Sequence, residues 1–160
     1  MFRRWSMAAA ISVSALGQPV WGQDAGWSVR RETDRMTGES SATAEVISGS
    51  KALMVRCVSG IPVVMLVAGD LIGRSADGRD RAFAPAYRVD DRPASTVAWS
   101  HIQSGGALMG VDARDFVTAV KDGESTVLTR IVTWQNRTID TEFNLRGSSG
   151  AISEALASCP

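Results

Sequence analysis

The stretch Leu53-Met54-Val55-Arg56-Cys57 decides the fold that we expect for this chain. Successive side chains of a strand point to opposite faces, so Leu53, Val55 and Cys57 share one face and Arg56 lies on the other. Three apolar or thiol side chains on one face and a charged one on the other are typical of a half-buried strand. The stretch therefore predicts a strand that turns a cysteine towards the core.

The only other cysteine, Cys159, lies near the end of the chain, where we expect a helix that ends at Cys159-Pro160. It follows an apolar stripe at spacings of seven, four and three residues, made by Ile152, Ala155 and Leu156. An even cysteine count in an exported chain favours an internal bond, so we predict a disulfide between Cys57 and Cys159. Two buried free thiols are the alternative, and a zinc site is less favoured because such sites show closely spaced ligand pairs.

The first 22 residues resemble a secretory signal peptide. Arg3 and Arg4 form the positive start, residues 7–16 form a short apolar segment, and Pro19 precedes the small residues before the expected cleavage at Gln23. The apolar segment is shorter than the roughly 20 residues that a membrane span needs, so an uncleaved anchor is the less favoured alternative. We therefore expect a signal at 1–22, a mature domain at 23–160, and a periplasmic or secreted location with no membrane span after cleavage.

The composition predicts one globular domain with a sizeable hydrophobic core and argues against nucleic acid as a partner. The chain has 160 residues, of which 44% are hydrophobic, and 17 basic residues balance 17 acidic ones. The signal contains two of the basic residues and no acidic one, which leaves a net charge of −2 for the mature part. A slightly acidic domain with dispersed charges is not expected to bind nucleic acid.

The order of the predicted elements favours an antiparallel, strand-rich α+β fold. We expect a β-sheet or small β-sandwich with one internal helix, capped at its start by Asp112, and a disulfide-tethered C-terminal helix capped by Ser148 or Ser149. The segment 61–68 is apolar on both faces, as expected for a central strand that is covered on both sides. Strands are predicted at 27–32, 42–46, 51–58, 61–68, 83–89, 97–99, 108–111, 127–134 and 139–145.

No catalytic, metal or cofactor site is predicted. His101 is the single histidine, but no nucleophile motif accompanies it, so a surface or loop position is the favoured interpretation. Asp77 and Asp80 lack the acidic spacing of a calcium loop. The glycines at 105, 106 and 110 lack the spacing of a phosphate-binding loop.

Two groups of residues remain as candidate contacts with a partner. The charged segment Tyr87–Pro93 offers Arg88, Asp90 and Arg92, although a salt-bridged strand end is the more common role of such a segment. Tryptophans could stack on sugar rings of an envelope glycan, although strand tryptophans more often belong to the core. The tryptophans of the mature part are Trp27, Trp99 and Trp134.

Several segments, taken in order, resemble the periplasmic type VI secretion-associated family called VasI or TagO. The matching residues are Trp27, Asp34-Arg35-Met36-Thr37-Gly38, Leu53–Cys57, Tyr87-Arg88-Val89-Asp90, Trp99-Ser100, Phe116, Arg130, Phe143-Asn144-Leu145-Arg146-Gly147 and the closing Ala151 to Cys159. The chain departs from the family pattern at Pro160, where a tryptophan is more usual. The resemblance matches Cys57 and Cys159 to the family cysteines, and it supplies no catalytic residues.

From these observations we expect a non-enzymatic accessory or binding protein of the cell envelope, with an envelope protein as its partner. The resemblance implies an association with type VI secretion. The alternative hypothesis is a glycan-binding protein or hydrolase that acts on peptidoglycan.

Overall fold

The computed structural model describes residues 26–68, 85–102, 105–133 and 136–159. The expected signal 1–22, the loop with Asp77 and Asp80, the residue Phe83 and the side chain of Trp134 lie outside these described residues. Within them the chain forms two antiparallel sheets and two helices, which confirms the predicted strand-rich α+β class.

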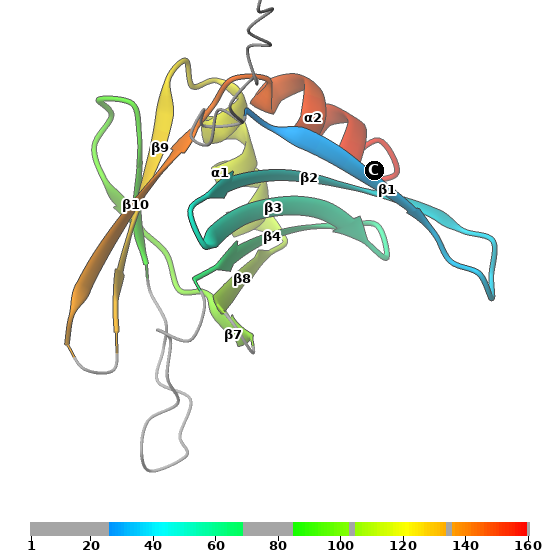
Figure 1. The fold of residues 1–160 in the computed structure, drawn as a ribbon, viewed down its shortest axis with the longest axis horizontal. Coiled ribbons are helices and arrows are strands. Elements are labelled where there is room, and N and C mark those ends of the chain that lie inside the picture. The colour runs from blue at the N-terminus through cyan, green and yellow to red at the C-terminus, as the bar shows by residue number, and fades with distance from the viewer. Residues whose placement is uncertain (1–25, 69–84, 103–104, 134–135, 160) are drawn as a thin grey trace, which may run out of the picture.

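The larger sheet has six strands in the order β1-β2-β3-β4-β8-β7, and every neighbouring pair is antiparallel. Its first four strands follow one another along the chain through tight turns, as the sequence predicts (Figure 1). The strands are β1 (Ser28–Thr33), β2 (Ser40–Ser48), β3 (Lys51–Val58), β4 (Ile61–Val67), β7 (Ser100–Ile102) and β8 (Gly105–Met109).

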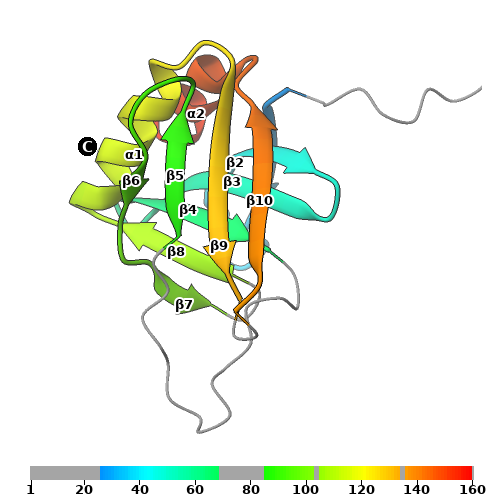
Figure 2. The same ribbon diagram turned by 90° about the vertical axis from the view of Figure 1, so that its left-hand side faces the viewer.

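The smaller sheet has four strands in the order β10-β9-β5-β6, and it stands across one end of the larger sheet (Figure 2). Its strands are β5 (Ala86–Val89), β6 (Ser95–Thr96), β9 (Thr126–Val132) and β10 (Thr138–Asn144). The single strand predicted at 97–99 is wrong. The chain leaves the smaller sheet after β6 and enters the larger one at β7, so its two short strands belong to different sheets.

Both helices, α1 (Val111–Lys121) and α2 (Ser148–Ala155), pack on one face of the larger sheet. That inner face carries the buried side chains of β2, β3, β4 and β8, and it forms one core with the helices and the smaller sheet. The central members of this core are Val46, Leu53, Val55, Val64, Leu66, Leu108, Phe116, Val120, Val127, Phe143 and Ile152.

The predicted helix caps are wrong, for a common physical reason. Both helices begin after a glycine with positive φ, Gly110 at 66° and Gly147 at 81°, and neither start has a side-chain cap. Asp112 lies in the first turn of α1, where its charge favours the positive helix end. Ser148 instead donates its hydroxyl to the carbonyl oxygen of Val120 at 3.3 Å, which joins α2 to α1.

The C-terminal helix is also shorter than predicted. It ends at Ala155, and a turn carries the chain on to Cys159, whose amide donates to the carbonyl oxygen of Leu156 at 2.9 Å. The second cysteine therefore belongs to the segment after α2, and the stripe of apolar residues in the helix ends before it.

Candidate partner-binding surfaces

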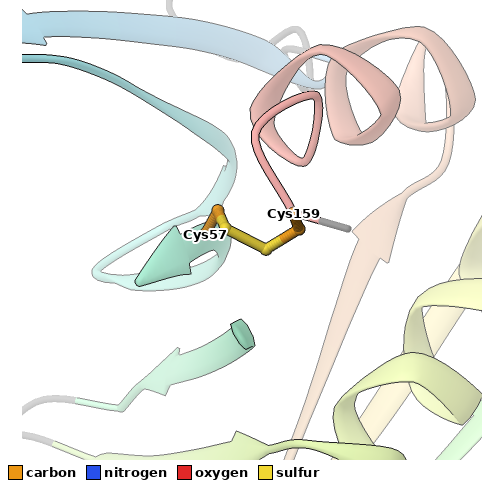
Figure 3. Close-up of a disulfide and its surroundings, with 2 residues drawn as sticks. All are labelled: Cys57 and Cys159. Atoms are coloured by element: carbon orange, nitrogen blue, oxygen red, sulfur yellow. A yellow bond between two sulfur atoms is a disulfide. The ribbon is translucent and has the colours of Figure 1, made fainter. Parts of the chain in front are cut away.

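The predicted disulfide joins Cys57 at the end of β3 to Cys159 after α2 (Figure 3). The two Cα atoms are 5.7 Å apart, and the residues are separated by 102 positions in the sequence. Cys57 lies on the inner face with Leu53 and Val55, as the alternation predicts, but both cysteines are half-buried. The bond therefore closes the rim of the core and holds the end of the chain against β3.

The charged segment after β5 has an internal structural role. Asp90 adopts a left-handed conformation with φ of 49°, and its carboxylate accepts hydrogen bonds from three successive amides at 2.9 Å. The donors are the backbone N–H groups of Glu124, Ser125 and Thr126. Asp90 thereby fixes the connection between α1 and β9.

The two arginines of this segment differ in their surroundings. Arg92 donates from Nη2 to the carbonyl oxygen of Asp122 at 2.9 Å, so it supports the same connection as Asp90. Arg88 lies exposed on the outward side of β5, opposite Leu128 of β9. Contact of Arg88, Asp90 and Arg92 with a partner stays a prediction. Of the two arginines, Arg88 has a side chain that makes no hydrogen bond among the described residues that would compete with such a contact, and it is exposed.

We expect Asp90 to contribute stability that depends on pH. The amide of Glu124, followed by those of Thr126 and Ser125, lowers the pKa of Asp90 below its ordinary value. A carboxyl group whose pKa is lower in the folded state stabilises the fold at pH values above its unfolded pKa of about 3.9. This contribution to stability is lost as the pH falls through the folded pKa. The variant Asp90→Asn should therefore be less stable than the native protein at neutral pH and should lose less stability on acidification.

Urea unfolding between about pH 7 and about pH 3 measures this effect as a difference in midpoint between native protein and variant. The exposed Asp91 provides a matched control, because Asp91→Asn removes the same charge one residue away. Equal midpoints for Asp90→Asn and Asp91→Asn at neutral pH would contradict the assigned role.

The tryptophans that the structure describes belong to the core. Trp27 is 8% exposed and Trp99 is 4% exposed, and the ring of Trp99 meets Phe116 edge to face at a centroid distance of 5.9 Å. Neither indole is therefore available as a platform for a sugar ring. His101 lies on β7, opposite Gly106 of β8. No cluster of three or more metal-ligating side chains occurs among the described residues.

The outer face of the six-stranded sheet carries neither helix; it is largely apolar over β3, β4 and β8, and it carries Arg30, Thr43 and Glu45 on β1 and β2. Four of its large side chains are strongly exposed: Ile47 (54%), Val58 (41%), Ile61 (48%) and Met109 (54%). The strand register makes Val58, Ile61 and Met109 contiguous, because Val58 faces Ile61 while Val63 faces Met109; Ile47 lies at the other end of these strands, in the row of Ala52 and Val67. We define this outer face by Thr43, Glu45, Ile47, Ala52, Met54, Arg56, Val58, Ile61, Val63, Met65, Val67, Gly105, Ala107 and Met109.

The outer side of β4 differs from the expectation that both faces of this strand are covered. The apolar residues on both faces of 61–68 predict a strand covered on both sides, and Val63 is indeed only 9% exposed. Ile61 is exposed, and Met65 and Val67 are half-buried. The inner face of β4 lies in the core, whereas its outer face is only partly covered by neighbouring side chains.

Arg56 is the charged residue that β3 contributes to the outer face, in a row with Arg30, Thr43, Val63 and Met109, and Glu45 of β2 lies on the same face opposite Met54. Its Nε atom is buried and has no hydrogen-bond partner among the described residues. An unpaired buried donor is costly, and a carboxylate is the strongest partner for a guanidinium. The outer face therefore combines apolar area with one donor whose hydrogen-bonding capacity is unused.

A polar cleft of about 390 Å³ lies where the β2–β3 turn approaches β10. Its walls are hydroxyl, amide and charged side chains, and sequence reasoning missed it because the two walls are far apart along the chain. The lining residues are Ser48, Gly49, Lys51, Thr126, Asp140, Thr141, Glu142 and Asn144.

The fold has a relative among solved structures. The structure of invasion associated protein B from Bartonella henselae matches this chain with a TM-score of 0.52 and 15% sequence identity, over 85% of this chain and 95% of that one. At this identity the likeness concerns the fold alone. No protein-family model matches the chain. The curated proteins contain no match either.

Proposed function

We propose that this chain is an exported, non-enzymatic binding protein of the cell envelope, and that it holds a protein partner on the outer face of its six-stranded sheet. The observation that carries the proposal is the contiguous apolar area around Ile61 and Met109. Exposed apolar patches of this kind mark interaction sites in folded proteins. No helix in the described part is long and apolar enough to cross a membrane.

The chemistry of the outer face specifies the partner that it fits. Met54 and Met65 face each other across β3 and β4, and methionine side chains adapt their shape to an apolar partner surface. Arg56 and Glu45 lie beside this pair, so a positive and a negative charge border the apolar area. The proposed partner is therefore a protein surface that presents mainly apolar side chains to β3, β4 and β8.

The compartment of this partner is proposed from two observations. The Cys57–Cys159 disulfide suits an oxidising environment, as found in the bacterial periplasm or outside the cell. The resemblance to the VasI or TagO family supports a partner from the type VI secretion apparatus.

The alternative function, binding or hydrolysis of peptidoglycan, gains no support from Trp27 or Trp99, because both are buried in the core. Digestion of peptidoglycan by the purified protein, with loss of activity on His101→Ala, would overturn the non-enzymatic proposal.

The proposal is tested by photo-cross-linking in living cells, with a photoreactive residue at Met109 or at Met36. Met36 lies in the β1–β2 turn and is 94% exposed, so it controls for adducts that form at any exposed methionine position. We expect an adduct at Met109 and none at Met36, and mass spectrometry of the adduct should identify a component of the secretion apparatus. Adducts of equal yield at both positions, or none at Met109, would overturn the outer face as the binding site.

A substitution on the outer face should abolish the same adduct. Ile61→Lys places a charge against the apolar partner and should lower the adduct yield about tenfold or more. Because Ile61 is already exposed, this change should alter the free energy of unfolding by only about 0.5 kcal/mol. An adduct that contains only a second copy of the chain would contradict a heteromeric partner.

A further inference from the structure

The strand β10 leaves one of its edges unpaired. It is the end strand of the four-stranded sheet, and within the described part of the chain it pairs with β9 alone. An unpaired edge presents a row of backbone N–H and C=O groups that can pair with another strand. In Figure 2 this edge is open beside the β2–β3 hairpin.

The polar cleft runs along this edge. β10 supplies one wall through consecutive residues from Asp140 to Glu142 and through Asn144, and Ser48, Gly49 and Lys51 supply the opposite wall. Five strand residues span about 14 Å, which is the length of a short extended peptide. The cleft therefore offers both backbone groups for pairing and a second wall to contact the side chains of an added strand.

The charges beside the edge select the kind of strand that could bind. Asp140 is already neutralised by Arg130, which donates from Nε and Nη2 to its two carboxylate oxygens at 2.7 Å and 2.6 Å. Glu142 faces Leu128 across the sheet, and neither it nor Lys51 on the opposite wall makes an ion pair among the described residues, so on the β10 wall the unpaired charge is negative. The Glu142 carboxylate is thus available to a basic side chain on an added strand.

The same charges disfavour pairing between two copies of this chain. If two β10 strands paired antiparallel about Glu142, the two unpaired Glu142 carboxylates would lie directly opposite each other. Like charges in directly opposed positions destabilise a strand pair. A strand from a different protein, with lysine or arginine at alternate positions, avoids this repulsion.

We infer that the edge of β10 binds an extended, basic peptide segment by strand addition, with a lysine or arginine of the segment on Glu142. The strand edge of this second binding site belongs to the smaller sheet, and only its opposite wall, Ser48, Gly49 and Lys51, belongs to the sheet that carries the outer face. Main-chain hydrogen bonds to β10 supply affinity, and Glu142 supplies specificity.

The test uses an acetylated and amidated octapeptide of alternating valine and lysine, titrated into the purified protein and followed by NMR. Two further versions of the peptide carry N-methyl groups on one or the other alternate set of amides. A strand added to an edge uses the amides of only one of its sides, so one methylated version should lose binding and the other should keep it. Binding should shift the signals of residues 138–144.

Substitutions of the protein separate strand addition from general charge attraction. Glu142→Lys should weaken binding about tenfold or more. Glu39→Lys makes the same change of charge in the β1–β2 turn, at the far end of the molecule from β10 (Figure 1), and should weaken binding much less. Equal binding of the two methylated peptides, equal effects of the two substitutions, or no saturable binding of the unmethylated peptide would each overturn the inference.

Discussion

Replacing Cys57 by serine should lower the free energy of unfolding by about 4–5 kcal/mol, which is a large part of the stability of a small domain. The disulfide joins residues that are 102 positions apart, and in the chain-entropy account its loss frees a long loop in the unfolded state. The folded state loses the clamp between β3 and the segment after α2, and the thiol of Cys159 is left unpaired.

Urea unfolding measures this effect, because the midpoint should fall while the denaturant dependence rises with the more expanded unfolded chain. The native protein in a reducing agent and the double variant Cys57→Ser/Cys159→Ser provide controls, since all three samples lack the bond. The helix α2 should remain folded in each, because Ala151, Ile152 and Ala155 still lie in the core. An unchanged midpoint would mean that the bond does not contribute to stability.

The sequence predicts well those features that depend on neighbouring residues. Alternation in 51–58 places Cys57 on the inner face, and glycine-containing turns at 35–38, 48–50 and 59–60 separate successive strands of the larger sheet. Each of these features is set by side chains and dihedral angles within a few residues, so periodicity and turn composition are sufficient to find them.

Features that depend on distant packing were not predictable in the same way. Polar residues near the expected helix starts predict caps at Asp112 and at Ser148 or Ser149, whereas each helix begins after a glycine with positive φ. Tertiary contacts decide the role of the serine. The hydroxyl of Ser148 donates a hydrogen bond to the carbonyl oxygen of Val120 in the other helix, and no local sequence pattern shows this contact. Asp90 likewise binds amides more than 30 residues further along the chain.

In the candidate site, too, features set by neighbouring residues are predictable from the sequence and features set by distant packing are not. The apolar character of β4 on both faces is plain in the sequence and is the signal of the outer face. Whether another layer covers that face depends on where the helices and the smaller sheet pack, and both lie on the inner side. The cleft beside β10 depends on the approach of the β2–β3 turn, so it emerges only from the folded arrangement.

Replacing Gly105 by alanine should be the other strongly destabilising change, because the backbones of β8 and β4 approach too closely there for a side chain. A Cβ atom at this position would lie 1.8 Å from the carbonyl oxygen of Leu66, and a backbone carbonyl in a central strand cannot move aside. We expect a loss of about 3 kcal/mol or more, at the upper end of the range for overpacked cores.

Besides lowering the stability of the whole domain, Gly105→Ala should loosen one part of the larger sheet more than the rest. Among the described residues β7 pairs only with β8, so displacement of β8 should loosen both strands and remove Met109 from the outer face. Hydrogen exchange should therefore lose protection first in residues 100–102 and 105–109, and the adduct at Met109 should weaken even though Met109 itself is unchanged.

Gly150→Ala is the matched control for this prediction. Gly150 lies within α2, where a Cβ atom meets nothing within 4 Å, so alanine should raise stability by up to about 1 kcal/mol through its higher helix propensity. The same substitution should thus have opposite signs at the two glycines, because one faces a backbone carbonyl and the other faces open space. A Gly105→Ala protein with a native urea midpoint would contradict the close approach of β8 to β4 on which the β8 part of the outer face depends.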